Sequence, residues 1–213
     1  VNAASEAFQT FSKSSQKERI ELLKNIIQEY ENRYKDFVEV ITKEMGAPNW
    51  LSERAQASTG LVNFKETLEA LEEYEFEKED GGYILRREPI GVIGMITPWN
   101  WPMNQITTKV SAAIASGCTM VLKPSEISPY CSMLLAEVMH KAFVPNGVLI
   151  STIPAFPFEP LTKPVLSHNF TVSLLEKHVL ALILSFSQGW PDNSNKLSIS
   201  IDTRLFCSLP NFV

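Results

Sequence analysis

The sequence predicts an α/β protein in which amino-terminal helices precede the first strand–helix–strand units of a doubly wound parallel sheet. Apolar residues recur every three or four positions between Ile20 and Met45. Short, almost wholly apolar segments begin near Ile90, Cys118 and Val148, and segments of helical length separate them. Buried strands that alternate with helices through short connections are typical of right-handed βαβ units.

The amino-terminal region is expected to be helical. Its apolar stripe fits one face of an α-helix and consists of Ile20, Leu23, Ile27, Tyr30, Tyr34, Phe37, Ile41 and Met45. Ser15 and Glu18 form a plausible capping box at the start, and Gly46 with Pro48 ends the helix. A coiled coil is the alternative, but the stripe is shorter than four heptads and contains Tyr and Phe. A second helix is expected from about Trp50 to Leu71, ending in an acidic stretch.

The sheet region begins after a turn at Gly81 and Gly82. The expected elements are, in order, strands Tyr83–Arg87 and Ile90–Ile96, helix Met103–Ser116, strand Cys118–Leu122, helix Pro129–Phe143 and strand Val148–Ile150. The strand starting at Ile90 is apolar throughout, as are strands covered on both faces. Ligands of such sheets bind outside the carboxyl ends of the strands. This rule selects two loops, Thr97–Pro102 and Lys123–Ser128.

The pattern is lost after Ile150. Five prolines fall between Pro145 and Pro164, and Thr171–Leu184 fits a strand or a helix equally. We therefore divide the chain into a patterned part, residues 1–150, with helices over 5–72 and sheet units over 83–150, and a tail of uncertain structure, residues 151–213.

Composition excludes several classes of function. The chain has 213 residues, 45% of them apolar, and a net charge of −5, which argues against a nucleic-acid partner. Its three cysteines have the spacing of neither a disulfide framework nor a zinc site, so no metal is expected. The longest apolar run, Val179–Phe186, is shorter than the roughly 20 residues of a membrane span. With no targeting segment recognisable, the expected location is the cytoplasm.

Each of the two loops has a functional and a structural interpretation. In the first, prolines rigidify the segment around Asn100, whose amide could stabilise an oxyanion or simply bond its own turn. In the second, Lys123 and Glu126 follow a buried strand and could bind the hydroxyls of a nucleotide ribose. The structural alternative is a solvated loop in which Ser125 and Glu126 cap a helix.

Taken together, these segments resemble the NAD(P)-dependent aldehyde dehydrogenase superfamily, in the family's order and spacing. The resemblance covers about residues 1–150 and rests on Arg87–Gly94, Ile96–Pro102, Lys123–Glu126, Glu44–Pro48 and Ala55–Gln56. It implies that residues 1–150 are the amino-terminal part of a Rossmann-like NAD(P)-binding domain. The parent enzyme would oxidise a small-molecule aldehyde to a carboxylic acid and form a homo-oligomer.

The resemblance also implies residue roles. Asn100 would hold the oxyanion, and Lys109 matches a lysine near the catalytic thiol, unless it is a surface lysine without a role. The nicotinamide-ribose side would be lined by Ile96, Thr97, Pro98 and Trp99, and the adenosine ribose would contact Lys123, Glu126 and the adjacent Ser125. Glu126 favours NAD over NADP, because a carboxylate repels the extra phosphate.

The family's reaction also needs a cysteine nucleophile and a glutamate general base. Cys118 matches a core position, Cys131 belongs to a helix, and Cys207 lies where the resemblance has ended. After Gly147 the only glycine is Gly189, so the family's glycine-rich turn is missing. We therefore expect a fragment that is inactive alone; the alternative is a non-catalytic binding or interaction protein derived from the same fold.

The abrupt loss of resemblance near residue 150 suggests a truncated enzyme whose reading frame has shifted, or an error in the gene assignment. A genuine lineage-specific tail is the alternative.

Overall fold

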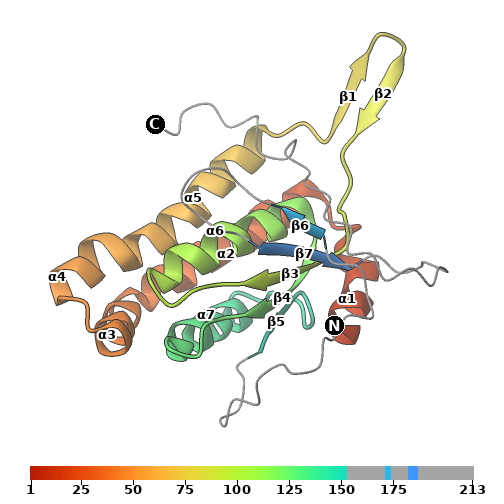
Figure 1. The fold of residues 1–213 in the computed structure, drawn as a ribbon. Helices are drawn as coiled ribbons and strands as arrows, with labels where there is room; N and C mark the ends of the chain where they lie inside the picture. Colours follow the sequence, from red (N-terminus) through yellow and green to blue (C-terminus); the bar gives the residue numbers. More distant parts are fainter. Residues whose placement is uncertain (153–170, 174–181, 187–213) are drawn as a thin grey trace.

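The computed structural model describes residues 1–152, together with the backbone of residues 171–173 and 182–186 (Figure 1). Its amino-terminal helical region consists of α1 (Asn2–Phe11), α2 (Gln16–Asn32), α3 (Tyr34–Met45), α4 (Asn49–Leu51), a π-helical segment (Ser52–Ala57) and α5 (Ser58–Glu73). The predicted capping box is confirmed: the Glu18 amide donates to Ser15 Oγ at 3.2 Å, and the Ser15 amide donates to Glu18 Oε2 at 2.6 Å.

The prediction of one helix across residues 20–45 is wrong. The chain breaks at Arg33 (φ −103°, ψ 12°), which ends α2 and precedes α3. The Arg33 side chain pairs with Asp36 and, at 3.2 Å, with Glu137 of another helix. Tyr30 and Phe37, on either side of the break, stack with ring centroids 4.1 Å apart. The apolar stripe therefore continues through the bend, which is why its periodicity alone does not reveal two helices.

The second predicted helix is confirmed, with a π-helical segment near its start. In this wider turn the buried Tyr30 hydroxyl donates to the Ala57 carbonyl at 3.0 Å. Burial raises the pKa of Tyr30 well above its ordinary value, so the hydroxyl keeps its proton. One turn later, a side chain at Gly60 would place Cβ 2.4 Å from the Tyr30 oxygen, so the tyrosine packs where only glycine leaves room.

The predicted α/β class is confirmed by three parallel strands and their crossover helices. Strands β3 (Val92–Ile96), β4 (Thr119–Lys123) and β5 (Leu149–Ser151) lie side by side and are joined by α6 (Pro102–Ser116) and α7 (Pro129–Lys141). The sheet order is β5-β4-β3-β7-β6, where β7 (Leu182–Phe186) pairs antiparallel with β3 and β6 (Thr171–Ser173) antiparallel with β7. The sheet is therefore mixed.

The helices form a layered body against this sheet. Since β3, β4 and β5 follow one another in the same direction, right-handed crossovers place α6 and α7 on one face. Helices α2 and α5 pack on α6, and α2 and α3 contact α7, while α1 contacts β3 and β4 (Figure 1). In the part of the chain that the structure describes, no helix has the length and apolar character needed to cross a membrane.

A two-stranded hairpin projects from this body (Figure 1). The predicted strand is β2 (Tyr83–Arg86), and it pairs antiparallel with β1 (Glu77–Asp80) across the expected Gly81–Gly82 turn. All eight residues of the two strands are exposed. The acidic sequence of β1 does not predict a strand. β1 is exposed and forms by pairing with β2, so it lacks the apolar pattern of a buried strand.

Candidate functional site at the carboxyl ends of the parallel strands

The two loops selected from the sequence adjoin one another. Ile96, which ends β3, stands opposite Lys123, which ends β4, and the Thr97 amide donates to the Lys123 carbonyl at 3.2 Å. Beyond β5, the Thr152 amide and hydroxyl donate to the Leu122 carbonyl at 2.8 and 3.3 Å. Hydrogen bonds thus join the three strand ends into one rim, the position at which α/β sheets bind ligands.

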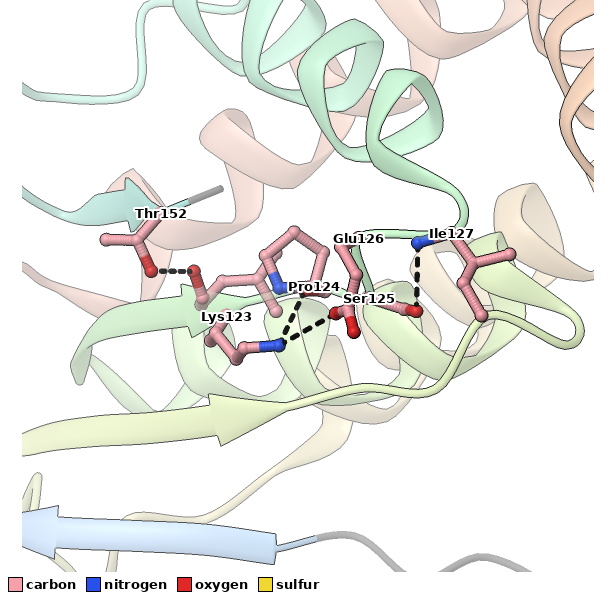
Figure 2. Close-up of polar contacts among 7 residues, drawn as sticks. Lys123, Pro124, Ser125, Glu126, Ile127 and Thr152 are labelled. Carbon is pink, nitrogen blue, oxygen red and sulfur yellow. Dashed lines mark hydrogen bonds and ion pairs between the residues drawn. The ribbon is translucent and has the colours of Figure 1, made fainter. Parts of the chain in front are cut away.

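The second loop presents an ion pair at this rim. Lys123 Nζ lies 3.1 Å from Glu126 Oε2 and donates a longer bond, 3.5 Å, to the Pro124 carbonyl (Figure 2). The pKa of the Glu126 carboxyl lies below its ordinary value because its own backbone amide, and then Lys123, hydrogen-bond to the charged form. Both side chains are about one-third exposed, so two opposite charges remain open to solvent at the end of β4.

Ser125 shapes this loop and does not cap a helix. It is buried, and its hydroxyl accepts from the Ile127 amide at 3.2 Å (Figure 2). The next helix starts only at Pro129, with Ser128 in the capping position. The structural alternative of capping by Ser125 and Glu126 is therefore wrong, and Glu126 is available for another role.

The first loop exposes its polar and aromatic side chains. Asn100, Trp99 and Pro98 are exposed, and Ile96 is 41% exposed at the strand end. Thr97 is buried, and its hydroxyl has no hydrogen-bond partner among the described residues. Trp101 adopts left-handed backbone angles (φ 55°, ψ 53°) before α6, a conformation that costs a non-glycine residue about 1–3 kcal/mol and is enriched at functional sites.

Lys109 lies inside the protein, which contradicts the alternative of a surface lysine. It is 5% exposed, and its ammonium group donates to the Gln105 carbonyl of its own helix at 2.8 Å. Desolvation lowers the pKa of Lys109 to about 8.

The two cysteines of the described region, Cys118 and Cys131, are buried free thiols. Cys118 is 2% exposed and Cys131 is fully buried. Burial, and then hydrogen bonding and charge from Glu44, raise the pKa of Cys131, so its thiol stays protonated. Cys207 and Gly189 lie outside the described residues. Within residues 1–152 no three potential ligand side chains form a group that could hold a metal ion.

Two residues with structural contacts in this region are not singled out as site residues by the sequence pattern. Thr152 ties β5 to the rim, and Glu44 accepts hydrogen bonds from the Tyr130 and Cys131 amides at 2.6 and 3.0 Å. Glu44 belongs to a segment that carries the family resemblance, but its contact joins positions 86 residues apart. No local pattern signals such a contact.

The fold and the rim define an α/β protein whose loops gather at the edge where such sheets bind ligands. Comparison with known proteins gives the family: the sequence model of the aldehyde dehydrogenase family matches residues 1–155. The chain belongs to the aldehyde dehydrogenase family.

Individual relatives agree over the same part of the chain. A protein of Staphylococcus haemolyticus, named as an aldehyde dehydrogenase, is 47% identical over 148 residues, which are 70% of this chain. This chain spans only 31% of that relative's length. A Bartonella henselae aldehyde dehydrogenase structure superposes with a TM-score of 0.70 at 44% identity. The match covers 72% of this chain and 33% of the Bartonella chain.

A further solved structure carries ligands. It is a mutant of Pseudomonas syringae aldehyde dehydrogenase C in complex with NAD⁺ and octanal, and it matches with a TM-score of 0.71 at 38% identity. The match covers 73% of this chain and 32% of that one.

Proposed function

We propose that this chain carries the adenosine-ribose and oxyanion parts of an NAD-dependent aldehyde dehydrogenase site. The observation that carries the proposal is the Lys123–Glu126 pair, open to solvent at the end of β4 and tied to β3 through Thr97. A ribose presents two adjacent hydroxyls. The carboxylate can accept from one hydroxyl and the ammonium can donate to the other, so each charged group keeps a charge-assisted hydrogen bond when ribose binds.

The first loop would serve the other end of the cofactor and the substrate. Ile96, Thr97, Pro98 and Trp99 continue from β3 along the same rim and would line the nicotinamide-ribose side. The exposed Asn100 amide would donate to the oxyanion that forms when a nucleophile attacks an aldehyde. The strained Trp101 and the flanking prolines support this role, because they fix the backbone on both sides of Asn100.

The proposed cofactor is NAD and not NADP. Glu126 is negatively charged at neutral pH, since its pKa is lowered by hydrogen bonds from its own backbone amide and from Lys123. A phosphate on the adenosine 2′ oxygen would lie against that charge and be repelled.

We also propose that residues 1–150 act as a partial cofactor-binding domain and that the chain alone does not oxidise aldehydes. The thiols of Cys118 and Cys131 are buried, and that of Cys131 is held protonated, so neither can attack a carbonyl. We assign turnover to the whole parent protein, which would be a homo-oligomeric, cytoplasmic enzyme. Lys109 would lie beside the catalytic thiol in that protein. A binding protein without catalysis is the second candidate, favoured by the same buried thiols.

Calorimetric titration of the full chain with AMP tests the cofactor site. Glu126→Gln removes the charged acceptor and is expected to weaken AMP binding about tenfold. It should also reduce the preference for AMP over adenosine 2′,5′-bisphosphate. Glu39→Gln is the matched control, because Glu39 forms an exposed ion pair with Lys43 on α3. Its titration should be unchanged.

The outcomes separate the candidates. Binding of AMP that depends on Glu126 supports a nucleotide site, whereas no binding at millimolar AMP contradicts it and favours an interaction protein. Equal affinity for both nucleotides would contradict the preference for NAD. Addition of an aldehyde and NAD should produce no absorbance from NADH; its appearance would contradict the proposed lack of turnover.

We propose further that the sequence beyond the family match, which ends at residue 155, results from a shifted reading frame. The loss of family resemblance past the end of this match supports this origin.

A further inference from the structure

Glu44 lies at the carboxyl-terminal end of α3, in a segment to which the proposed function gives no role. Its two carboxylate oxygens accept hydrogen bonds from Tyr130, at 2.6 Å, and Cys131, at 3.0 Å. These are backbone amides of the first turn of α7, which have no partner within a helix. One helix thus supplies the cap of another, and the negative charge meets the positive end of the α7 dipole.

The residue in the capping position of α7 provides no side-chain cap of its own. Ser128 has φ −130° and ψ 60° and makes no side-chain cap, whereas Ser15 is extended (φ −69°, ψ 158°) and caps α2. The Ser128 amide donates to the Ser125 carbonyl at 3.3 Å and so closes the turn that contains Glu126. Ser128 thus lies in this turn without the extended conformation of a capping residue, and Glu44 supplies the cap from α3.

The position of Glu44 is itself fixed. α3 ends at the next residue, Met45, and its C-cap Gly46 adopts φ 67° and donates its amide to the Thr42 carbonyl. The following Ala47 packs into the core. Glu44 is thus held between a closed helix end and the start of α7.

We propose that Glu44 is a positioning residue for the loop Lys123–Ser128. By holding the first turn of α7, it fixes where Glu126 stands relative to Lys123 and keeps the pair set for a ribose. This inference rests on the proposed function, since it assigns Glu44 to the same nucleotide site.

The test uses the full chain, with AMP as the probe and amide hydrogen exchange as a second measurement. Glu44→Ala is expected to weaken AMP binding about tenfold, as small displacements of binding groups do. It should also accelerate exchange at Ile127, Tyr130 and Cys131. Glu44→Gln keeps one acceptor oxygen and should fall between Glu44→Ala and the unaltered chain in both measurements.

Glu18→Ala is the matched control, because Glu18 is also a carboxylate that caps a helix, at the distant start of α2. It should lower the melting temperature and leave both AMP binding and exchange at Ile127 unchanged. Glu44 is merely structural if Glu44→Ala melts earlier but binds AMP normally, or if Glu18→Ala weakens AMP binding equally.

The two proposals fail differently. If the unaltered chain does not bind AMP, the proposed function is contradicted. Exchange at Ile127 then decides alone: acceleration in Glu44→Ala supports a role in holding the loop, and no change contradicts it.

Discussion

At the scale of single residues, two helix ends have the same hydrogen-bond pattern but a different amino acid at the left-handed position. After α6, Gly117 and Cys118 donate to Ile114 and Ala113 at 3.0 and 2.9 Å. After α7, Phe143 donates to His140 at 3.2 Å and Val144 donates to Met139 at 3.0 Å. Both are Schellman motifs, whose left-handed residue is usually glycine.

Gly117 meets that requirement at φ 78°, but Phe143 adopts φ 62° with a side chain that is 83% exposed. A left-handed conformation costs a residue with a Cβ about 1–2 kcal/mol, partly offset by the entropy that glycine loses on folding. Phe143→Gly is therefore expected to raise the free energy of unfolding by about 0.5–1 kcal/mol, measured by urea denaturation.

Phe143→Ala separates backbone strain from the removal of an exposed aromatic ring. It keeps the Cβ and the left-handed backbone, so we expect no gain in stability. If it stabilises the chain as much as Phe143→Gly, the strain at this position is not the cause.

At the scale of elements, α6 buries a lysine, Lys109, and this makes stability depend on pH. Lys109 has its pKa lowered to about 8 from an ordinary value of 10.5, so the unfolded chain holds the proton more tightly. Stability therefore rises with pH between these two values. The free-energy cost of burying the charged Lys109 ammonium is fully present below pH 8 and is lost as pH rises towards 10.5.

Lys109→Met should remove this dependence. Between pH 7.5 and 9.5 the free energy of unfolding of the unaltered chain should rise by about 2 kcal/mol relative to the variant. Denaturation at several pH values measures the difference, and Lys35→Met, at an exposed position of α3, is the control. Equal slopes for Lys109→Met and the unaltered chain would contradict a buried, titrating ammonium.

Which elements could be predicted from the sequence depends on the range of the interactions that form them. The strands β3 and β4 and both crossover helices follow from local apolar pattern, and the rim follows because parallel strands end at one edge. The break at Arg33 could not be predicted, because its ion pair with Glu137 joins two helices far apart in the sequence.

The same reasoning applies to the candidate site. The adjacency of Ile96, Thr97 and Lys123 could be predicted, since it is set by strand register. The left-handed Trp101 and the cap from Glu44 could not. The left-handed conformation is rare for an aromatic residue. The cap joins two helices that are far apart in the sequence.

At the scale of the whole molecule, the chain combines a family match over residues 1–155 with a remainder that the match does not include. The shifted-frame hypothesis predicts what the nucleotide sequence contains downstream of the Gly147 codon. One of the other two frames should encode the family's glycine-rich turn, its glutamate motif and its cysteine motif. Sequencing the locus checks this, and their absence from every frame would favour a lineage-specific tail.

The projecting β1–β2 hairpin lies in the segment of chain that links α5, which ends at Glu73, to β3, which begins at Val92. The packing of α5 on α6 and of α2 on α6 and α7 does not pass through it. A single cut between Gly81 and Gly82 would thus leave two polypeptides held together by the buried core, each carrying one strand of the hairpin. We therefore expect the molecule to be divisible there into two complementary pieces and to accept new sequence at that turn with the rim unchanged, because the residues of both hairpin strands are exposed.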